Sequence, residues 1–421
     1  MKNIFFTDFK VTAFFLSNLV TLGMKRLVFF LVLSVFFLSC DRIENEKIIL
    51  TGVIEVVDSV SFFFDSTTVS PLFTVGRFQY IPEENRLAYL NNVSNSRYLE
   101  FKNMVESIKL FDFESGLVNQ TIPLIHYGRN MVSDPSYFFY RSPDSIWVYP
   151  SNPITNFRGD FQMALMNDKG WVDMRIQLRD VFKRGARPMS GRFGAIVQRG
   201  GELIISSYIP SLGRDANSTF IKMDINNWRS DFMEYDPRPY KDISIKFKGN
   251  TSWSSFRDLA EIRSVKDNDN NVVSNLPLDH RLWVLSPSGK TKGIEVRSKY
   301  LLGFPILDYE PLDQAELGLQ VKASGRYMGI LFDAKREIYY RITRLPLADI
   351  EPLRDKDFQP KFTYTVMAID KEFNLLAESK FSSKDYLFEI GLFEGPEGIY
   401  VLRNSVDENK MVFDNLMLVQ Q

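Results

Sequence analysis

The two histidines of the chain are the first residues to consider for catalytic or metal-binding chemistry. His126 lies in IPLIHYGRN and His280 lies in LDHRLWV, and neither has a second histidine or a cysteine at ligand spacing. A zinc site needs several such ligands, so the sequence excludes a His-rich or Cys-rich zinc centre. The sequence also lacks the G-x-S-x-G turn that presents a nucleophilic serine. We therefore expect both histidines to be structural hydrogen-bonding residues.

The segment KDNDNNVVSN at 266–275 is a candidate calcium loop, because acidic and amide side chains stand at alternate positions, as in an EF-hand. The match then fails. Val272 stands where the sharp turn needs glycine, and Leu278 stands where a bidentate glutamate belongs. The segment predicts a solvated loop, with a weak surface calcium site as the alternative. We expect neither a structural metal nor a cofactor.

Basic residues gather in the segment 174–199, where Asp180 is the single acid. The centre of this segment reads KRGARPMSGRFG, and its glycines let the backbone approach a ligand closely. Arginine presents a planar fork that suits carboxylate or phosphate groups. The segment therefore predicts an anion-binding loop formed by Arg184, Arg187 and Arg192. A solvated loop whose arginines pair with acids elsewhere is the alternative.

Paired carboxylates are a further kind of catalytic site, since glycosidases use two of them. The chain holds 52 aspartates and glutamates, so pairs arise by chance and identify no site. The S-x-D-x-G-x-x-W box of sialidases is absent. The stretch MNDKGWV at 166–172 has different spacing, and it predicts a strand, a turn and a buried Trp171. No catalytic residue is predicted.

The elements that would position these side chains are short strands, because apolar segments separated by turn residues make up the chain from about Ile48 onward. The strands recur in pairs. The first members are aromatic-rich, and they are 86–92, 145–151, 202–208, 281–287, 337–343 and 398–404. The second members include 108–118, 162–172, 220–228 and 364–376.

The pairs repeat at nearly constant spacing. Equivalent residues of the first members lie 56 to 61 positions apart, except for a gap of 79 between Leu203 and Leu282. Repeats of several strands are typical of β-propeller blades, which bury their faces against each other in a ring. The sequence predicts an all-β propeller of six blades, or seven if segments 243–249 and 260–267 supply one more. Two β-sandwiches are the alternative.

The only cysteine of the chain, Cys40, ends a secretory signal pattern. Lys25 and Arg26 precede the apolar run 27–38, and the small Ser39 stands at the expected cut. A run of this length is too short to span a bilayer. In bacteria a cysteine at this position resembles the lipobox cysteine, which is acylated and becomes the mature N-terminus. Cys40 is therefore predicted to anchor the protein to a membrane. A buried cysteine and an uncut membrane helix are the alternatives.

This signal divides the chain into four expected parts. Residues 1–23 are a second, weaker apolar stretch, so we expect translation to start at Met24; a two-part anchor is the alternative. Residues 24–39 form the lipoprotein signal peptide, 40–47 a polar tether, and 48–421 one propeller domain. The predicted location is the bacterial cell envelope, at the outer membrane.

Two segments, SGRYMGILFDAKREIYYRITRLP at 324–346 and GLFEGPEGIYVLRN at 391–404, together with the lipobox-like cysteine, resemble a family of Bacteroidetes-type lipoproteins. That family is defined by a domain of unknown function, number four-two-two-one. The most specific part of the resemblance is the pattern D-x-x-R-x-x-Y-Y-R, formed by Asp333, Arg336, Tyr339, Tyr340 and Arg341. The resemblance implies lipidation and a propeller-like fold, and it implies no mechanism.

The residues of this pattern also predict local structure. If they form one strand, Tyr339 and Tyr340 point to opposite faces, because successive side chains alternate. Arg341 then lies on the same side as Tyr339 and is expected to pair with a carboxylate such as Asp333.

The anchor and the lack of catalytic motifs favour a non-catalytic binding or scaffold protein of the envelope, with a protein or a glycan as its partner. The formal net charge of −1 gives no support to nucleic-acid binding. Two alternatives stay open. One is an enzyme that acts on glycans through carboxylates on the propeller axis, and the other is a sensor or assembly subunit of a membrane complex.

Overall fold

The computed structural model of the protein describes the following residues: 52–71, 77–92, 106–125, 130, 132, 135–150, 162–177, 187–188, 196–208, 219–227, 230–234, 259, 262–304, 306, 314–355, 357–405, 407 and 409–420. The chain divides into two compact units, and every described residue lies in the second, Ile49–Gln421. Cys40 and the expected signal peptide therefore lie outside the described residues. Within the described part, no helix is long and apolar enough to span a membrane.

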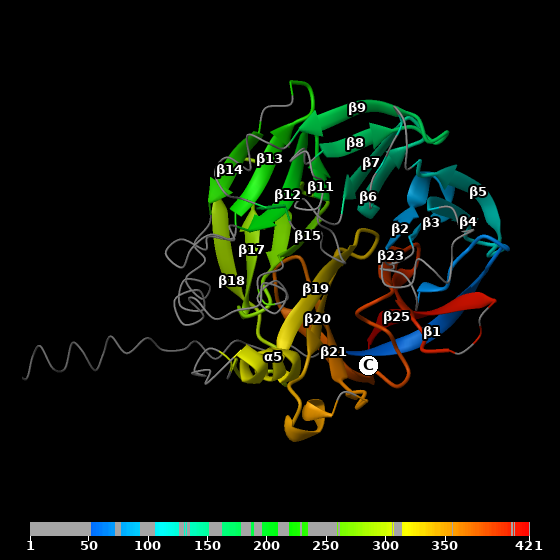
Figure 1. The fold of residues 1–421 in the computed structure, drawn as a ribbon. Coiled ribbons are helices and arrows are strands. Elements are labelled where there is room, and N and C mark those ends of the chain that lie inside the picture. The colour runs from blue at the N-terminus through cyan, green and yellow to red at the C-terminus, as the bar shows by residue number, and fades with distance from the viewer. Residues whose placement is uncertain are drawn as a thin grey trace, which may run out of the picture. The chain divides into compact units, whose positions relative to one another are not determined.

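The described residues form six antiparallel sheets around a central axis, so the fold is a β-propeller with six blades, as predicted (Figure 1). Blade 1 consists of β2 (Phe78–Ile81), β3 (Arg86–Asn91), β4 (Ser107–Asp112) and β5 (Val118–Pro123). Blade 2 consists of β6 (Pro135–Ser142), β7 (Ser145–Pro150), β8 (Gln162–Met166) and β9 (Val172–Gln177). Blade 3 consists of β10 (Arg187–Pro188), β11 (Ile196–Arg199), β12 (Glu202–Tyr208), β13 (Thr219–Asp224) and β14 (Ser230–Glu234).

The second half of the ring continues this arrangement. Blade 4 consists of β15 (Arg263–Lys266), β16 (Val272–Asn275), β17 (Arg281–Leu285) and β18 (Thr291–Glu295). Blade 5 consists of β19 (Arg326–Asp333), β20 (Ile338–Arg344), β21 (Thr363–Ile369) and β22 (Leu375–Ser382). Blade 6 consists of β23 (Leu392–Gly395), β24 (Gly398–Leu402), β25 (Lys410–Gln420) and β1 (Gly52–Phe63). The described helices are α5 (Gln314–Ala323) and two short 3-10 turns, η2 (Pro82–Glu84) and η4 (Glu351–Arg354).

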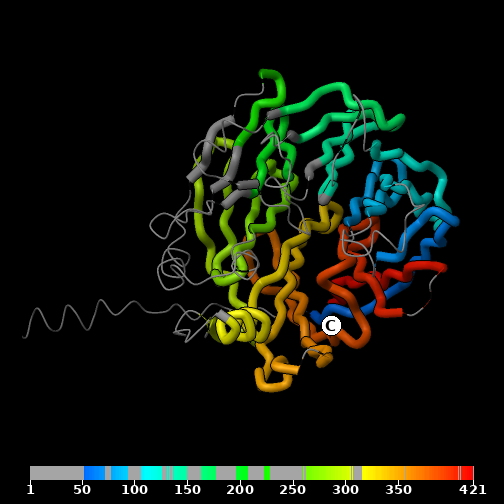
Figure 2. The backbone as a smooth tube through the Cα atoms, in the orientation of Figure 1, coloured from blue at the N-terminus to red at the C-terminus, as the bar shows by residue number. Residues whose placement is uncertain are grey.

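Blade 6 joins the two ends of the described chain. β1 pairs antiparallel with β25, from Gly52 opposite Gln420 to Phe63 opposite Lys410. The blue and red ends of the tube consequently run together in Figure 2. Because the first strand completes the last sheet, closure of the ring is fixed by backbone hydrogen bonds rather than by side chains alone.

Buried side chains fill the space between neighbouring blades, and the described residues contain one such cluster for each of the six interfaces. Central strands are therefore covered on both faces. All seven residues of β20 are buried, which explains why its sequence, IYYRITR, shows no alternation of polar and apolar residues. The outer strand β18, in contrast, is exposed or half-buried along its whole length. α5 covers the interface between blades 3 and 4 through Leu317 and Val321.

The repeat predicted from the sequence places equivalent strands correctly in five blades. In blade 4 the predicted strand is shifted by one strand position. Five of the predicted first members contain β3, β7, β12, β20 and β24, each of which is second from the axis. The segment 281–287 instead contains β17, the third strand of its blade, so the gap of 79 residues reflects a mismatched strand. The segment 260–267 contains β15, the inner strand of that same blade, and 243–249 lies outside the described residues.

Candidate functional site

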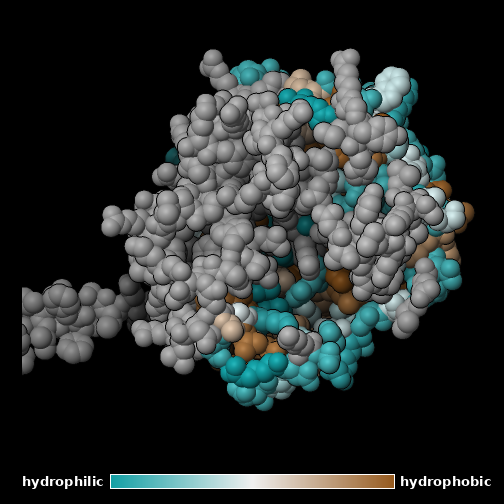
Figure 3. All heavy atoms as spheres, in the orientation of Figure 1, coloured by the Kyte–Doolittle hydropathy of each residue, from teal (hydrophilic) through white to brown (hydrophobic). Residues whose placement is uncertain are grey.

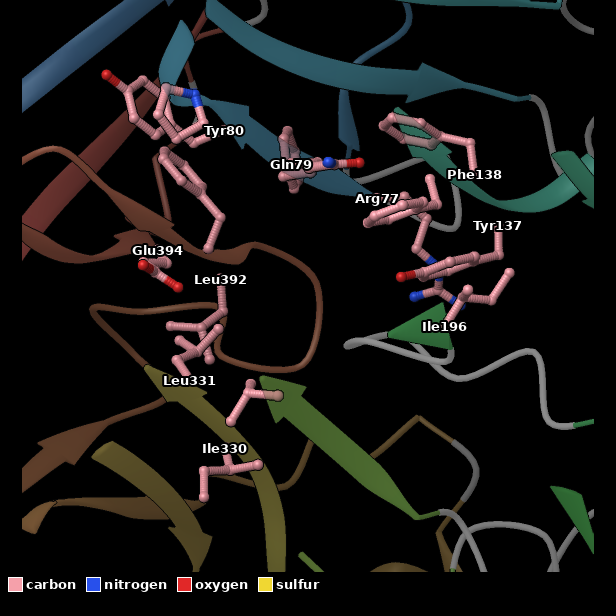
Figure 4. A pocket seen from close by; sticks show the side chains of 15 residues that line it. Arg77, Gln79, Tyr80, Tyr137, Phe138, Ile196, Ile330, Leu331, Leu392 and Glu394 are labelled. Carbon is pink, nitrogen blue, oxygen red and sulfur yellow. The ribbon is translucent and has the colours of Figure 1, made fainter. Parts of the chain in front are cut away.

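The six inner strands of the propeller surround a cavity of about 290 Å³ on the axis, and Figure 4 shows its lining side chains from close by. The inner strands are β2, β6, β11, β15, β19 and β23. Each is followed by a short turn into the second strand of its blade, so all six run in the same direction along the axis. A residue at the start of an inner strand therefore lies toward one end of the cavity, and a residue beside the turn lies toward the other.

Apolar and aromatic side chains form most of the cavity wall. They come from all six inner strands and from Pro82 just after β2, and the strand residues are Phe78, Tyr80, Tyr137, Phe138, Phe139, Ile196, Val265, Ile330, Leu331, Leu392 and Phe393. Figure 3 shows hydrophobic and hydrophilic residues side by side near the centre of the ring. A concave, largely apolar wall with few polar groups is typical of a site for a small organic molecule. The volume lies just below the usual range of about 300–1,000 Å³ for such sites, so a ligand would be small.

Arg77 supplies a positive charge at one end of the cavity. It directly precedes β2, so it lies where the inner strands begin. The side chain is 3 % exposed, and Figure 4 shows its guanidinium beside the ring of Tyr137. Arginine keeps its charge throughout the physiological pH range and presents five N–H donors in a plane. This end of the cavity therefore holds a permanent cation.

Glu394 supplies a carboxyl group toward the other end. It is the third residue of β23, next to the turn, and Figure 4 shows it across the cavity from Arg77. Its Oε1 accepts a hydrogen bond from the Ala334 N–H at 3.4 Å. Burial raises the pKa of the Glu394 carboxyl to about 7; the Ala334 bond opposes this rise, and the charge of Asp333 adds to it. A carboxyl that titrates near neutral pH inside a cavity is a candidate for ligand binding or proton transfer.

Gln79, another polar residue of the wall, is used by the fold. Its Nε2 donates to the Tyr140 carbonyl at 2.7 Å, and its Oε1 accepts from the Tyr140 N–H at 2.8 Å. These two bonds join β2 of blade 1 to β6 of blade 2. Within the described lining, Arg77 and Glu394 are the charged residues.

The residues predicted to bind an anion stay a prediction. Arg184 and Arg192 lie outside the described residues. The backbone of Arg187 lies in β10, opposite Tyr208 of β12. Cys40, the predicted lipidation site, also lies outside the described residues, and so does His126.

Asp333 and Arg336 of the family-like pattern hold the turn between β19 and β20. Asp333 Oδ1 accepts hydrogen bonds from the N–H groups of Lys335 and Arg336, both at 3.1 Å, and its Oδ2 pairs with Arg336 Nη1 at 2.9 Å. Arg336 also pairs with Glu397 of blade 6 at 3.0 Å. These residues therefore stabilise a turn and link two blades.

Tyr339 and Tyr340 are buried on opposite faces of β20, as predicted. The Tyr339 hydroxyl donates to Asp267 Oδ2 of blade 4 at 2.8 Å. The Tyr340 hydroxyl accepts from the Leu418 N–H of blade 6 at 3.3 Å. The two rings consequently fasten blade 5 to both of its neighbours.

Arg341 points toward blade 4, but the expected pair with Asp333 is wrong. Arg336 lies three residues from Asp333 and takes that carboxylate, while Arg341 lies further along the hairpin. The Arg341 side chain is fully buried, and its guanidinium carbon lies 3.3 Å from the centroid of the Tyr327 ring.

The hydrogen bonds of Arg341 run instead to the neighbouring blade. Its Nε donates to Asn275 Oδ1 at 2.7 Å. Its terminal nitrogens donate to the carbonyls of Asp279, His280 and Val296 at 2.6 to 2.8 Å. The residues of the family-like pattern thus stabilise the contacts between neighbouring blades. They contribute no side chain to the described lining of the axial cavity.

His280 is a structural hydrogen-bonding residue, as expected. Its Nδ1 lies 2.8 Å from the Tyr327 hydroxyl. Burial, followed by the positive charges of Arg297 and Arg341, lowers the pKa of His280 to about 4. The imidazole is therefore neutral at pH 7, which suits a hydrogen bond inside a blade interface.

In the segment 266–275, residues 267–271 form a tight turn between β15 and β16, whereas Val272–Asn275 form β16 and are buried, so the prediction of a solvated loop is wrong for that half. Asp267 accepts hydrogen bonds from the Asn271 N–H at 2.7 Å and from Asn271 Nδ2 at 2.8 Å. Among the described residues, no cluster of His, Cys, Asp and Glu is arranged to hold a metal ion. The prediction that Trp171 is buried is wrong: it follows the β8–β9 turn and is 57 % exposed.

Arg77 and Glu394 were missed because each lies in or directly next to a short inner strand with no recognisable motif. The strands predicted from the sequence were mostly the second and third of each blade, and the inner strands β2 and β23, with four residues each, were not recognised. A search for a short segment just before each predicted first strand would have found both RFQYI at 77–81 and LFEG at 392–395. A charged residue inside such an apolar segment is the available signal.

Comparison with known proteins identifies a family and a fold. The family model described as "Domain of unknown function (DUF4221)" matches residues 53–380. A crystal structure of a DUF4221 member from Bacteroides vulgatus is similar to this chain, with a TM-score of 0.64 and 18 % identity; the match covers 88 % of this chain and 100 % of that chain. The search of curated proteins found no match.

Two more distant structures also match. A calcium-binding protein, regucalcin, from Agrobacterium tumefaciens has a TM-score of 0.46 and 11 % identity, with 88 % of this chain and 98 % of that chain covered. Virginiamycin B lyase from Staphylococcus aureus has a TM-score of 0.37 and 10 % identity, with 86 % of this chain and 99 % of that chain covered.

Proposed function

The chain belongs to the DUF4221 family, and because the function of that family is unknown, we propose a function from the site itself: a non-catalytic binding protein of the bacterial cell envelope that holds a small molecule in its axial cavity. The observation that carries the proposal is the apolar cavity on the ring axis, with Arg77 and Glu394 as its charged groups. Convergent polar groups in an apolar hollow fix the orientation of a ligand.

Binding fits this lining better than glycan hydrolysis does. Glycosidases place two carboxyl groups on either side of the scissile bond. In the described lining Glu394 is the carboxyl residue, and the charged group across the cavity from it is Arg77. An arginine supplies neither the nucleophile nor the general base of that reaction.

A glycan-active enzyme is the second candidate, because one observation favours it. Burial raises the pKa of Glu394 to about 7, as a general acid requires. In that case Glu394→Gln would abolish glycan hydrolysis by the full chain. Under the binding proposal, wild type and variant both release no reducing sugar from envelope glycans.

The envelope location rests on the signal pattern that ends at Cys40. Two acyl chains on this cysteine would give stable anchoring, where one chain is marginal. The propeller would then present its cavity at the membrane surface of the cell envelope, where small molecules pass.

The test is to identify what the cavity carries. The full chain is extracted from its own envelope in detergent, denatured with organic solvent, and the released small molecules are analysed by mass spectrometry. Leu331 is half-buried in the lining, so Leu331→Trp should fill the cavity. Leu302→Trp is the matched control, since Leu302 is 80 % exposed and is not part of the lining.

The proposal expects one compound at near-stoichiometric amount in wild type and Leu302→Trp, and its loss from Leu331→Trp. Recovery of the same compound from all three proteins would show that it binds elsewhere, and the cavity would lose its assigned role.

A further inference from the structure

The carboxyl group of Glu394 lies in the axial cavity without a basic partner. Its Oε1 accepts one long hydrogen bond, of 3.4 Å, from the Ala334 N–H. In the part of the chain that the structure describes, no lysine or arginine forms an ion pair with it. Figure 4 shows the side chain among those that line the cavity. An ionised carboxyl in an apolar cavity is costly unless a cation accompanies it.

The basic residues beside this end of the cavity have other partners. Lys335 and Arg336 of the β19–β20 turn both pair with Glu397, at 2.8 and 3.0 Å. Arg77, across the cavity, has an interaction of its own within the protein. Among the described residues, the fold therefore supplies no cation to Glu394.

Acidic turns surround the end of the cavity that lies beside Glu394. In the six blades the first and second strands are joined by the turns 82–85, 143–144, 200–201, 267–271, 334–337 and 396–397. Because all six inner strands run the same way, these turns lie at one end of the ring. Together they carry seven acidic residues and two basic ones. An excess of one charge at the end of a cavity attracts ligands of the opposite charge.

We propose that the axial cavity binds an organic ammonium ion: a small, mostly apolar molecule whose positive group lies against the Glu394 carboxyl. This inference rests on the proposed binding function and specifies its ligand class. The positive charge of Arg77 at the other end repels such a group, so the ligand is oriented with its ammonium toward Glu394 and its apolar part toward the rest of the wall.

The composition of the lining favours an organic cation over a metal ion. Calcium takes six to eight oxygen ligands, whereas Glu394 is the single carboxyl residue of the described lining. The lining contains six aromatic residues from β2, β6 and β23, and Figure 4 shows one of them, Tyr80, on the same side of the cavity as Glu394. Aromatic faces attract ammonium groups and cover alkyl groups. The volume of about 290 Å³ leaves room for a short alkyl chain or a ring and excludes a polymer.

Ligands of equal chain length separate the effect of charge from that of size. The probes are hexylammonium and trimethylhexylammonium, with hexan-1-ol as the neutral control and hexanoate as the anionic one. Binding to the full chain in non-ionic detergent, after removal of any bound molecule, is measured by titration calorimetry near pH 8. At least one ammonium ion should bind about tenfold more tightly than hexan-1-ol, and hexanoate should bind more weakly. Equal affinity of the ammonium ions and hexan-1-ol would overturn the inference, and so would the absence of ammonium binding.

A variant without the charge assigns the binding to Glu394. Glu394→Gln keeps the size of the side chain, and it should lower the affinity for the ammonium ion at least about tenfold without changing that for hexan-1-ol. Glu372→Gln is the matched control, on an exposed residue outside the lining, and should change neither. Unchanged ammonium affinity in Glu394→Gln would refute the assignment. If this variant does not fold, the comparison of ligands on the wild-type protein still decides.

Proton release gives an independent readout. Burial raises the pKa of Glu394 to about 7, and an ammonium group favours the ionised carboxyl. Binding at pH 7 should therefore release about half a proton per ligand, measured by calorimetry in two buffers of different ionisation enthalpy. The other groups facing Glu394 are Asp333, which is paired with Arg336, and Tyr80, whose pKa burial raises above 10; Arg77 lies across the cavity. Glu394→Gln should release no proton, and a release equal to that of wild type would contradict the role of this carboxyl.

The solvent-release experiment separates this inference from the binding function. A neutral or anionic compound recovered from the cavity would leave the binding function standing and refute the inference. If Leu331→Trp bound hexylammonium as tightly as wild type does, the site would lie outside the cavity, and both would fail.

Discussion

Replacing Arg341 by methionine tests whether blades 4 and 5 are held by polar contacts as well as by packing. The Arg341 side chain is fully buried and makes four short hydrogen bonds to blade 4, to Asn275 Oδ1 and the carbonyls of Asp279, His280 and Val296. A fifth bond, to the Arg281 carbonyl, is 3.4 Å long. Methionine fills similar space without donors. The four acceptors would then lie in a dry interface without these partners.

The size of the effect follows from those acceptors. Each buried acceptor that loses its donor costs about 1–3 kcal/mol. Four such losses do not add fully, because the variant also avoids the cost of burying a cation. We expect Arg341→Met to lower the free energy of unfolding by about 3–5 kcal/mol, a large share of the roughly 5–15 kcal/mol that stabilises a typical domain. Arg341→Lys keeps the charge but offers three donors and no plane, so it should cost about half as much.

Urea unfolding of the full chain in detergent, followed by tryptophan fluorescence, measures this difference. A loss of stability should shift the midpoint and leave the slope unchanged. Arg297→Met, at an exposed position, should change the free energy of unfolding by less than about 0.5 kcal/mol. A cost below about 1 kcal/mol for Arg341→Met would show that packing alone holds this interface.

Four further predictions follow from the same structure and sequence. Tyr339→Ala should cost about 3–5 kcal/mol in urea unfolding, whereas Lys335→Ala, at the exposed β19–β20 turn, should cost less than about 0.5 kcal/mol. Burial raises the pKa of Glu394 from its ordinary 4.5 to about 7, so its contribution to stability is complete below pH 4.5 and is lost as the pH rises through 7. Glu394→Gln should therefore flatten the stability profile in that window. Cys40→Ala should prevent acylation and move the protein out of the membrane fraction, as measured by fractionation and palmitate labelling. Deletion of residues 1–23, so that translation starts at Met24, should leave export and labelling unchanged.

Each of these has an outcome that contradicts it. Equal, small costs at Tyr339 and Lys335 would place the motif at the surface. A stability profile of Glu394→Gln that falls between pH 4.5 and 7 as steeply as wild type would assign the titration to another group. Acylated Cys40→Ala protein would exclude the lipobox reading, and loss of export in the shortened chain would give residues 1–23 a role.

Strand β16, which was not predicted from the sequence, explains why the predicted repeat is wrong in blade 4. β16 has the sequence VVSN and follows an Asp- and Asn-rich turn, so it looks like the end of a loop. Ser274 and Asn275 are fully buried, because the Ser264 hydroxyl meets Ser274 at 2.9 Å and Arg341 donates to Asn275. Both partners come from other strands. Local pattern favours a loop here, and contacts distant in sequence make it a strand.

The residues that line the cavity could not be predicted from the sequence for a related reason. Arg77 and Glu394 lie near opposite ends of the chain, and only closure of the ring by β1 and β25 brings their blades together. Periodicity predicted the ring, because repeated strands of similar length are a local property. Which residues face the axis depends on which strand is innermost, and the inner strands β2 and β23 have only four residues each, too few to show a period.

The family-like pattern and the cavity have separate roles in this fold. Asp333 and Arg336 form a turn, and the tyrosines and Arg341 after them fasten blade 5 to blades 4 and 6. Such contacts are needed by any ring of this size, whatever it binds. The most recognisable residues of the sequence therefore account for the fold, while under the proposed binding function the ligand would be selected by a few residues on the inner strands. If this division is correct, exchanging Arg77 and Glu394 for other residues will change which ligand is bound, while the stability that depends on Tyr339 and Arg341 stays intact.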